Sequence, residues 1–189
     1  MGEMTEAVAL VEGLSDKAAL EALAERRRRD LAAEGVSIVP IGGAQAIGRF
    51  LAEFGPEGRD LRVAGLCDAA EEGEFRRGLE RAGLGSNLGR RDLERLGFYV
   101  CDADLEDELI RALGAVSVEQ VVEAQGDLAA FRTLQRQPAW EGRPIEDQLR
   151  RFMGSGGSRK LRYARYLVEA LDLSRIPRPL DGVLAHVLR

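Results

Sequence analysis

The sequence is poor in the side chains that bind soft metals or form cross-links. Among 189 residues it has one histidine, His186, and two cysteines, Cys67 and Cys101. Neither cysteine has a second cysteine or a histidine at ligand spacing, so a zinc site is not expected. Both cysteines lie in apolar, strand-like runs. We therefore expect buried, reduced thiols, as in a cytoplasmic protein.

Long apolar segments are also missing. No run approaches the roughly 20 apolar residues of a membrane span, and the N-terminus has no basic segment followed by a long apolar stretch. Neither a membrane span nor a signal peptide is predicted. Hydrophobic residues make 45% of the chain and charged residues 31%, which is ordinary for one folded domain.

The net charge of -5 is unevenly distributed along the chain. Up to Gln125 there are 15 Lys and Arg against 25 Asp and Glu, whereas from Gly126 onward there are 12 against 7. An acidic first part and a basic second part favour a protein that holds metal cations with one part and a polyanion with the other, although solvated surface charge gives the same count.

Short apolar runs alternate with helical patterns in the first part of the chain. A continuous apolar run is typical of a strand covered on both faces, as in a parallel α/β sheet. We expect strands at 7–11, 36–41, 61–67 and 96–101, helices at 16–33, 44–54, 72–82 and 102–113, and a loop at 83–91. The run Arg26 to Arg29 then falls late in its helix, where cations complement the helix dipole.

After Gly126 the pattern becomes all-helical, with helices expected at 128–135, 144–153, 158–171 and from 181 onward. We therefore divide the chain into a core, residues 1–125, and a helical extension, residues 126–189, which completes the same domain and carries a basic segment. The fold class expected is α/β with a mostly parallel four-stranded sheet between helices.

Acidic residues follow the predicted strands. Glu12 ends the first strand, Asp68 ends the third, and an acidic segment follows the fourth. Because ligands bind beyond the carboxyl ends of parallel strands, we expect these groups to converge there. Neighbouring carboxylates repel one another unless protons or cations neutralise them. Oxygen ligands without histidine or thiolate favour Mg²⁺ or Mn²⁺, and the common chemistry of such sites is displacement at phosphorus.

Several stretches resemble a known family. "LVEGLSDKAALEAL", "GVSIVPIGGAQAIGRFL" and "LRVAGLCDAAEE" are similar to the Toprim domain of topoisomerases, primases and related nucleases. "DADLEDELIRALG", "FRTLQRQPAW" and "SRKLRYARYLVEAL" resemble the Toprim part of the OLD (overcoming-lysogenization-defect) family nucleases. The resemblance implies a Toprim fold, a DNA endonuclease using two metal ions, Mg²⁺ or Mn²⁺, and an ABC-type ATPase partner. No P-loop is present, so that ATPase would lie in a separate chain or a missing region.

The resemblance also implies roles for single residues. Glu12 matches a family residue that serves as metal ligand and general acid-base. Asp16 matches a second metal ligand, and Asp68 matches the first acid of the family's Asp-x-Asp motif. The chain departs from that motif at Ala70, and the candidate substitutes are Glu71 and Glu72. Asp104 and Glu106 match the acidic segment that holds the second metal, with Glu108 as a weaker candidate.

Lys160 matches the family lysine that stabilises charge at the scissile phosphate. Independently, it falls in the first turn of a predicted helix, where an anion is favoured. Residues 150 to 165 hold six basic residues and no acid, with Phe152, Tyr163 and Tyr166 between them. This pattern favours a DNA backbone beside stacked bases, but tyrosines in such positions are more often core or rim residues than base contacts. The DNA-binding residues expected are Arg150, Arg151, Arg159, Arg162 and Arg165.

The function expected is metal-dependent hydrolysis or nicking of DNA. The first alternative is a degenerate Toprim module that binds DNA or an ATPase without cutting, because Ala70 removes one ligand. The second alternative is a nucleotidyl transferase of primase type. Such an enzyme needs nucleotide- and template-binding parts, which the sequence does not suggest.

Overall fold

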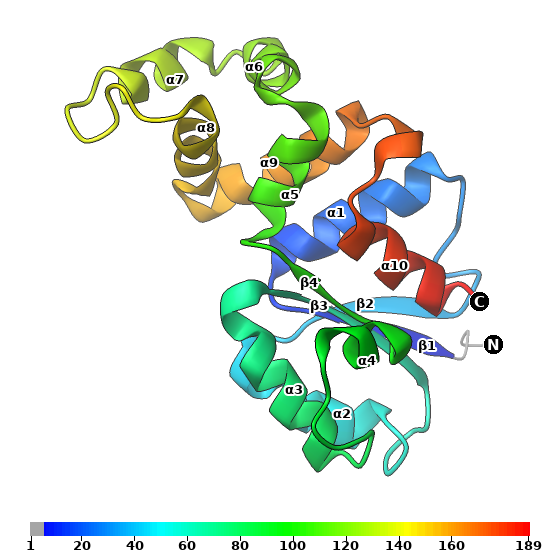
Figure 1. The fold of residues 1–189 in the computed structure, drawn as a ribbon. Coiled ribbons are helices and arrows are strands. Elements are labelled where there is room, and N and C mark those ends of the chain that lie inside the picture. Colours follow the sequence, from blue (N-terminus) through cyan, green and yellow to red (C-terminus); the bar gives the residue numbers. More distant parts are fainter. Residues whose placement is uncertain (1–5) are drawn as a thin grey trace.

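The computed structural model describes residues 6–189 and contains one parallel sheet between two layers of helices (Figure 1). The strands are β1 (Ala7–Val11), β2 (Val36–Pro40), β3 (Arg62–Asp68) and β4 (Phe98–Cys101), and their order across the sheet is β2-β1-β3-β4. The three pairings β1–β2, β1–β3 and β3–β4 are all parallel. The expected α/β fold with a four-stranded parallel sheet is thus confirmed.

Helices flank the sheet and continue into an arm. They are α1 (Leu14–Arg26), α2 (Ile47–Phe54), α3 (Glu72–Arg81), α4 (Arg90–Arg95), α5 (Leu105–Leu113), α6 (Ala115–Ala124), α7 (Leu128–Gln135), α8 (Ile145–Gly154), α9 (Gly157–Ala170) and α10 (Arg178–Val187). Short 3₁₀ turns cover η1 (Ala44–Ala46), η2 (Ala69–Glu71) and η3 (Leu173–Arg175). Figure 1 shows α1 and α10 on one face of the sheet, α2, α3 and α4 on the other, and α6, α7 and α8 standing off as the arm. No helix among residues 6–189 is long and apolar enough to cross a membrane.

Alternate side chains of β1 point to opposite faces of the sheet and belong to two separate hydrophobic cores. Ala7, Ala9 and Val11 belong to a core shared with α1, α5, α9 and α10, whereas Val8 and Leu10 belong to a core shared with α2, α3 and α4. Every β1 residue is buried. This burial on both faces explains why the strand reads as a continuous apolar run.

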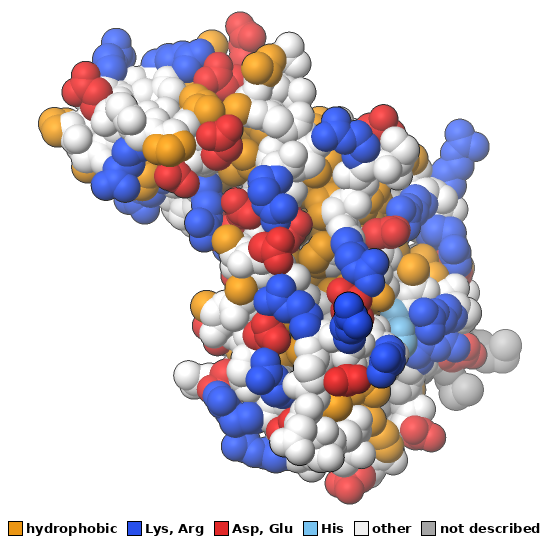
Figure 2. Space-filling view, viewed as in Figure 1, with side chains coloured by type: hydrophobic (Ala, Val, Ile, Leu, Met, Phe, Trp, Pro, Cys, Tyr) orange, Lys and Arg blue, Asp and Glu red, His pale blue; other side chains and the backbone are white. Residues whose placement is uncertain are grey.

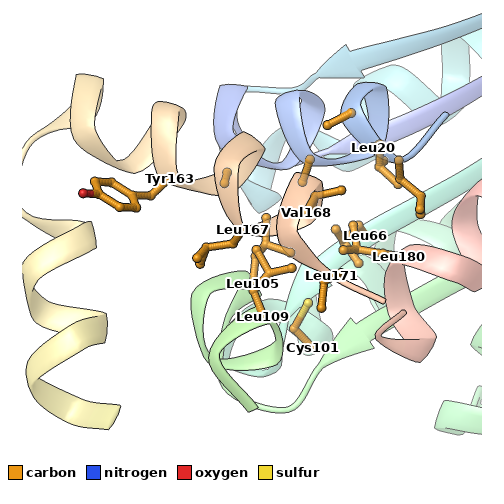
Figure 3. Packing of buried hydrophobic residues seen from close by; sticks show 14 of the residues in the cluster. Leu20, Leu66, Cys101, Leu105, Leu109, Tyr163, Leu167, Val168, Leu171 and Leu180 are labelled. Carbon is orange, nitrogen blue, oxygen red and sulfur yellow. The ribbon is translucent and has the colours of Figure 1, made fainter. Parts of the chain in front are cut away.

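The C-terminal helices pack onto the first core. Figure 3 shows side chains of α9 meeting those of α1, α5 and the sheet, with labels on Leu20, Leu66, Cys101, Leu105, Leu109, Leu167, Val168, Leu171 and Leu180. Cys67 and Cys101 are free and buried, as expected, and burial raises the pKa of both thiols.

The structure corrects two expected elements. The first helix ends at Arg26 instead of residue 33, because Arg28 adopts a left-handed conformation with φ 57°. Arg28 and Arg29 therefore lie outside the helix, and the Arg26 guanidinium donates to the carbonyl oxygens of Val168 and Leu171 at the end of α9. The expected loop at 83–91 runs into α4, whose first turn is capped where Gly89 N–H donates to the Asp92 carboxylate.

Candidate active site

The candidate site is built on the turn after β1. Glu12 follows the last β1 residue, and its Oε1 accepts a hydrogen bond of 2.8 Å from the backbone N–H of Asp68. That bond ties the end of β1 to the end of β3. In the next turn, Asp16 Oδ2 accepts from Gly13 N–H at 2.9 Å, which fixes the first turn of α1.

The β2 turn closes over the backbone of Glu12. Gly42 and Gly43 N–H groups donate to the Glu12 carbonyl oxygen at 3.2 and 3.3 Å. Both glycines have positive φ, 76° and 116°, a region that side-chain-bearing residues rarely adopt. The two glycines therefore allow the loop to approach the site closely.

The second half of the site lies at the start of α5. Asp104 caps this helix through Oδ1, which accepts from Asp107 N–H at 2.9 Å, and its Oδ2 accepts from Arg150 Nε at 2.7 Å. Asp102, two residues earlier, pairs with Arg90 and Arg111.

Glu106 is the most deeply buried acid of the site. It is 5% exposed, and its Oε2 lies 3.4 Å from Lys160 Nζ on α9. Its Oε1 is buried without a hydrogen-bond partner in the part of the chain described. A buried carboxylate oxygen without a partner carries a desolvation cost that a bound cation would offset.

The acids interact electrostatically. Burial raises the pKa of Glu12, Asp16, Asp68 and Glu106, and the charges of neighbouring acids raise each of these pKa values further. The pKa of Asp68 reaches about 7, chiefly through burial, with added repulsion from Glu12, Asp16 and Asp104.

Lys160 balances part of this negative charge. Burial alone would lower its pKa, but Glu106 and Asp16 outweigh that effect and raise it. The ammonium therefore stays charged at neutral pH. Lys160 is also the cation that lowers the pKa of Glu12, Asp16 and Asp68, so α9 brings it to the acids of both β1 and β3.

The donor chemistry of the site fits a divalent cation, since only carboxylate oxygens are offered and their pKa values indicate mutual repulsion. However, among residues 6–189 no group of three or more Asp, Glu, His or Cys side chains is arranged so that it could hold a metal ion. In several of these acids, one carboxylate oxygen already accepts a hydrogen bond from a backbone N–H or pairs with a basic side chain. Metal binding would therefore require side-chain rotations.

The structure distinguishes Glu71 from Glu72 as a replacement for the second acid of the Asp-x-Asp motif, which this chain lacks. Ala70 is exposed in the η2 turn. Glu71, in the same turn, raises the pKa of Glu12 by its charge and so lies within electrostatic range of the site. Glu72 instead pairs with Arg76 and Arg90, and the Arg90 hydrogen bond lowers its pKa.

Glu108 is committed elsewhere. It is buried, accepts from the Asp102 backbone N–H at 2.9 Å and lies 3.0 Å from Arg111. Its carboxylate stabilises the turn between β4 and α5 and lines a different pocket from Glu106 and Lys160. We therefore retain Glu71 and drop Glu72 and Glu108 from the proposed ligands.

The expected DNA-binding arginines are dispersed. Arg150 pairs with Asp104 beside the site, and Arg151 lies over the Trp140 ring. Arg159 donates to Ser155 Oγ and stacks on Phe152, whereas Arg165 pairs with Glu25 and Glu169. Arg162 is exposed.

The aromatic residues of the basic segment are largely internal. Phe152 and Tyr163 are fully buried, and Tyr163 donates a hydrogen bond to Asp127. Base stacking on Phe152 or Tyr163 is therefore excluded in this structure. Sequence reasoning also overlooked Trp140 and Arg143, which join Arg150, Arg151 and Lys160 around one pocket; no local pattern links them.

The comparisons with known proteins concern the same regions. Residues 4–69 match the family model "Overcoming lysogenization defect protein-like, TOPRIM domain", a span that includes Glu12, Asp16 and Asp68. The search of curated proteins found no match.

Two solved structures share the fold over nearly the whole chain. The C-terminal region of the Xanthomonas campestris pv. campestris OLD protein has a TM-score of 0.74 at 24% identity, covering 97% of this chain and 92% of that chain. The C-terminal region of the Burkholderia pseudomallei OLD protein has a TM-score of 0.70 at 21% identity, covering 97% of each. Asp104, Glu106 and Lys160 lie outside the family-model match, so for them this likeness is one of fold.

Proposed function

We propose that this chain, which has the fold of an OLD-like Toprim domain, is a metal-dependent DNA endonuclease. The observation that carries the proposal is the buried Glu106 Oε1, which has no hydrogen-bond partner among residues 6–189 and lies on a carboxylate paired with Lys160, among acids whose pKa values are raised. Such an oxygen carries a desolvation cost that a bound cation or a proton would offset. The ions expected are Mg²⁺ or Mn²⁺, two in number.

Glu12, Asp16, Asp68 and Glu71 would hold one ion, and Asp104 and Glu106 the other. When bound, divalent cations neutralise charge on the phosphate and acidify a bound water. Glu12, with its raised pKa, would exchange a proton with the attacking or leaving oxygen. Lys160, charged at neutral pH, would share the negative charge that develops on the phosphate oxygens.

The ion pair between Asp104 and Arg150 would have to open for Asp104 Oδ2 to bind metal. Glu106 would bind metal through Oε1 and would keep Lys160 on Oε2. Opening the first pair would release the Arg150 guanidinium next to the site, where it becomes available to a phosphate. DNA and metal binding are therefore expected to favour one another.

Cleavage of supercoiled plasmid tests the proposal. The purified chain is incubated with Mg²⁺, with Mn²⁺ or with chelator, alongside Glu12→Gln and Lys160→Ala. We expect metal-dependent nicking or linearisation that falls about 100-fold or more in both variants, since each loses a group acting on the reacting atoms. Exposed Glu53→Gln and Arg91→Ala are the matched controls and should keep full activity. Equal cleavage by all variants would contradict the assignment of the site.

A non-cleaving module that binds DNA or an ATPase partner is the second candidate, favoured by the exposed Ala70 in place of an acid and by the lack of a ready three-acid group in residues 6–189. Glu71→Gln separates the two. If Glu71 replaces the missing ligand, this variant loses both cleavage and the rise in melting temperature caused by Mn²⁺. If the wild type binds DNA without cutting it, and cuts only with an ABC-type ATPase added, the chain is the partner-dependent form.

A further inference from the structure

An open pocket of about 470 Å³ adjoins the candidate active site. Its lining includes Asp104, Glu106 and Lys160 of the candidate site and Trp140, Arg143 and Arg151 of the arm. Because three lining residues belong to the candidate site, a strand whose phosphate lies at Lys160 would extend directly into this pocket. In Figure 2 the surface is hollowed between the arm and the helices below the sheet, with Lys and Arg side chains where the arm meets the body.

Trp140 is the only tryptophan of the chain, and its position is held by hydrogen bonds between helices. Its carbonyl oxygen accepts from Gln148 Nε2 at 2.8 Å, and Gln148 Oε1 in turn accepts from Gln135 Nε2 at 2.7 Å. Gln148 is buried. The loop between α7 and α8 is thereby fixed, while the indole stays partly exposed at the pocket.

Two guanidinium groups accompany this ring. Arg143 and Arg151 lie 5.1 and 5.9 Å from the Trp140 ring centroid, and Arg143 is anchored by donating to the Ala139 carbonyl oxygen at 2.8 Å. Both guanidinium groups lie over the ring, so a base that stacks on Trp140 would displace one of them, and the displaced cation would then be available to a phosphate. Aromatic rings combined with cations are the groups that bind single-stranded nucleic acid.

The charge of the pocket depends on the site next to it. Its lining includes four cations, Lys160 and three arginines, and three acids, of which Asp104 and Glu106 are proposed metal ligands. With a divalent cation on those two acids, the pocket becomes strongly positive. It would then attract an anionic strand when the site is loaded.

We propose that this pocket binds the single-stranded DNA segment that flanks the scissile phosphate, with a base on Trp140 and a phosphate between Arg143 and Arg151. The inference rests on the proposed nuclease function, and it adds the path of the strand. A base can stack on Trp140 only if it has left the stack of a duplex, so the flank enters unpaired. The α6–α8 arm thus acts as a strand-binding element, and unpaired or frayed DNA is the preferred substrate.

Intrinsic fluorescence tests the proposal directly, because a single tryptophan reports from the pocket. The full chain is titrated with short oligothymidylate in Ca²⁺, and a gel checks that the oligonucleotide stays intact. We expect a saturable change in Trp140 emission, with an affinity that agrees with anisotropy of a labelled oligonucleotide. Binding seen by anisotropy without any change in emission would overturn the proposal.

Variants supply the second readout. Trp140→Ala, Arg143→Ala and Arg151→Ala should each weaken oligonucleotide binding by about tenfold, and the two arginine variants should each reduce the salt dependence by about one phosphate contact. Arg136→Ala, an exposed arginine of the same arm outside the pocket, is the matched control and should bind like the wild type. Equal affinities for all four variants would overturn the proposal.

Failure of the strand pocket and failure of the nuclease function give different results. If plasmid cleavage is metal-dependent but all pocket variants bind and cleave like the wild type, the function stands and the pocket is wrong. If no cleavage occurs but the emission change and the arginine effects are present, the pocket stands as a binding site and the nuclease assignment is wrong.

Discussion

Backbone amides and basic side chains already take part of the charge that a metal ion would neutralise. Glu12 accepts from Asp68 N–H, Asp16 from Gly13 N–H, and Asp104 pairs with Arg150. These contacts stabilise the acidic turns in the metal-free protein. They also explain why the oxygens do not already surround one point, since each such contact orients a carboxylate toward a protein donor.

The raised pKa of Asp68 predicts how metal-free stability depends on pH. Its pKa rises from about 4 to about 7 on folding, so between these values the folded state binds more protons than the unfolded state. The free energy of unfolding should therefore fall as pH rises from about 4 to about 7 and level off above. Glu12, Asp16 and Glu106 act with the same sign, since their pKa values are also raised.

Urea unfolding in chelator across this pH range measures the effect. Asp68→Asn should show a shallower slope than the wild type and a higher stability at neutral pH, whereas the exposed control Glu57→Gln should keep the wild-type slope. Parallel curves for the wild type and Asp68→Asn would show that this carboxyl is not perturbed in solution.

Among the elements, β3 and β4 are held close by a glycine. Gly65 is the register partner of Phe98, and a Cβ at position 65 would lie 2.5 Å from the Phe98 ring and 3.2 Å from the Leu10 carbonyl oxygen. Phe98 is buried and packs edge-on against Phe75. The ring has little room to move, so the glycine sets how closely β4 carries the α5 acids to β3.

Gly65→Ala should therefore destabilise the protein by about 1–3 kcal/mol through overpacking. The control is Gly48→Ala in α2, where a Cβ meets nothing within 4 Å and helix propensity predicts a gain of about 0.5–1 kcal/mol. Chemical denaturation of both variants measures the difference. A neutral Gly65→Ala would mean that β3 and β4 separate easily, and the α5 acids would then not be rigidly placed.

On the scale of the whole molecule, the helical extension is part of the core. Side chains of α9 pack on α1 and α5, and those of α10 pack on the sheet face formed by Ala7, Ala9 and Val11. Lys160 and Arg150 also come from this extension. The acids and the cations of the site thus belong to opposite ends of the sequence and meet only when both parts fold together.

A fragment of residues 1–125 should consequently fail to fold. It would expose the apolar face of α1 and one face of the sheet, which α9 and α10 cover in the full chain. Circular dichroism during thermal unfolding should show one cooperative transition for residues 1–189 and none for the fragment. A cooperative transition in the fragment would contradict this and would mean that the extension adds to a core that is stable alone.

Local patterns were enough to predict the strands and the acids at their ends. A buried parallel strand must be apolar throughout, and the acids after it must lie at one edge of the sheet. Glu12, Asp68 and an acidic segment after the fourth strand could therefore be found without coordinates, whereas only the family resemblance singled out Asp104. The α/β fold followed from the same alternation. Helix ends were less predictable: α1 stops at Arg26 because of a left-handed residue that no periodicity indicates.

Only the tertiary structure decided which side chains meet. It placed Glu71 within electrostatic range of Glu12, paired Glu72 with Arg90 and Arg150 with Asp104, buried Tyr163, and brought Trp140, Arg143 and Lys160 around one pocket. These contacts join residues far apart in the chain, and they follow from how α8 and α9 pack on the core and not from local preference. The sequence by itself therefore determined the fold class and the acidic edge, whereas packing decided the partners of each charge and the pocket beside them.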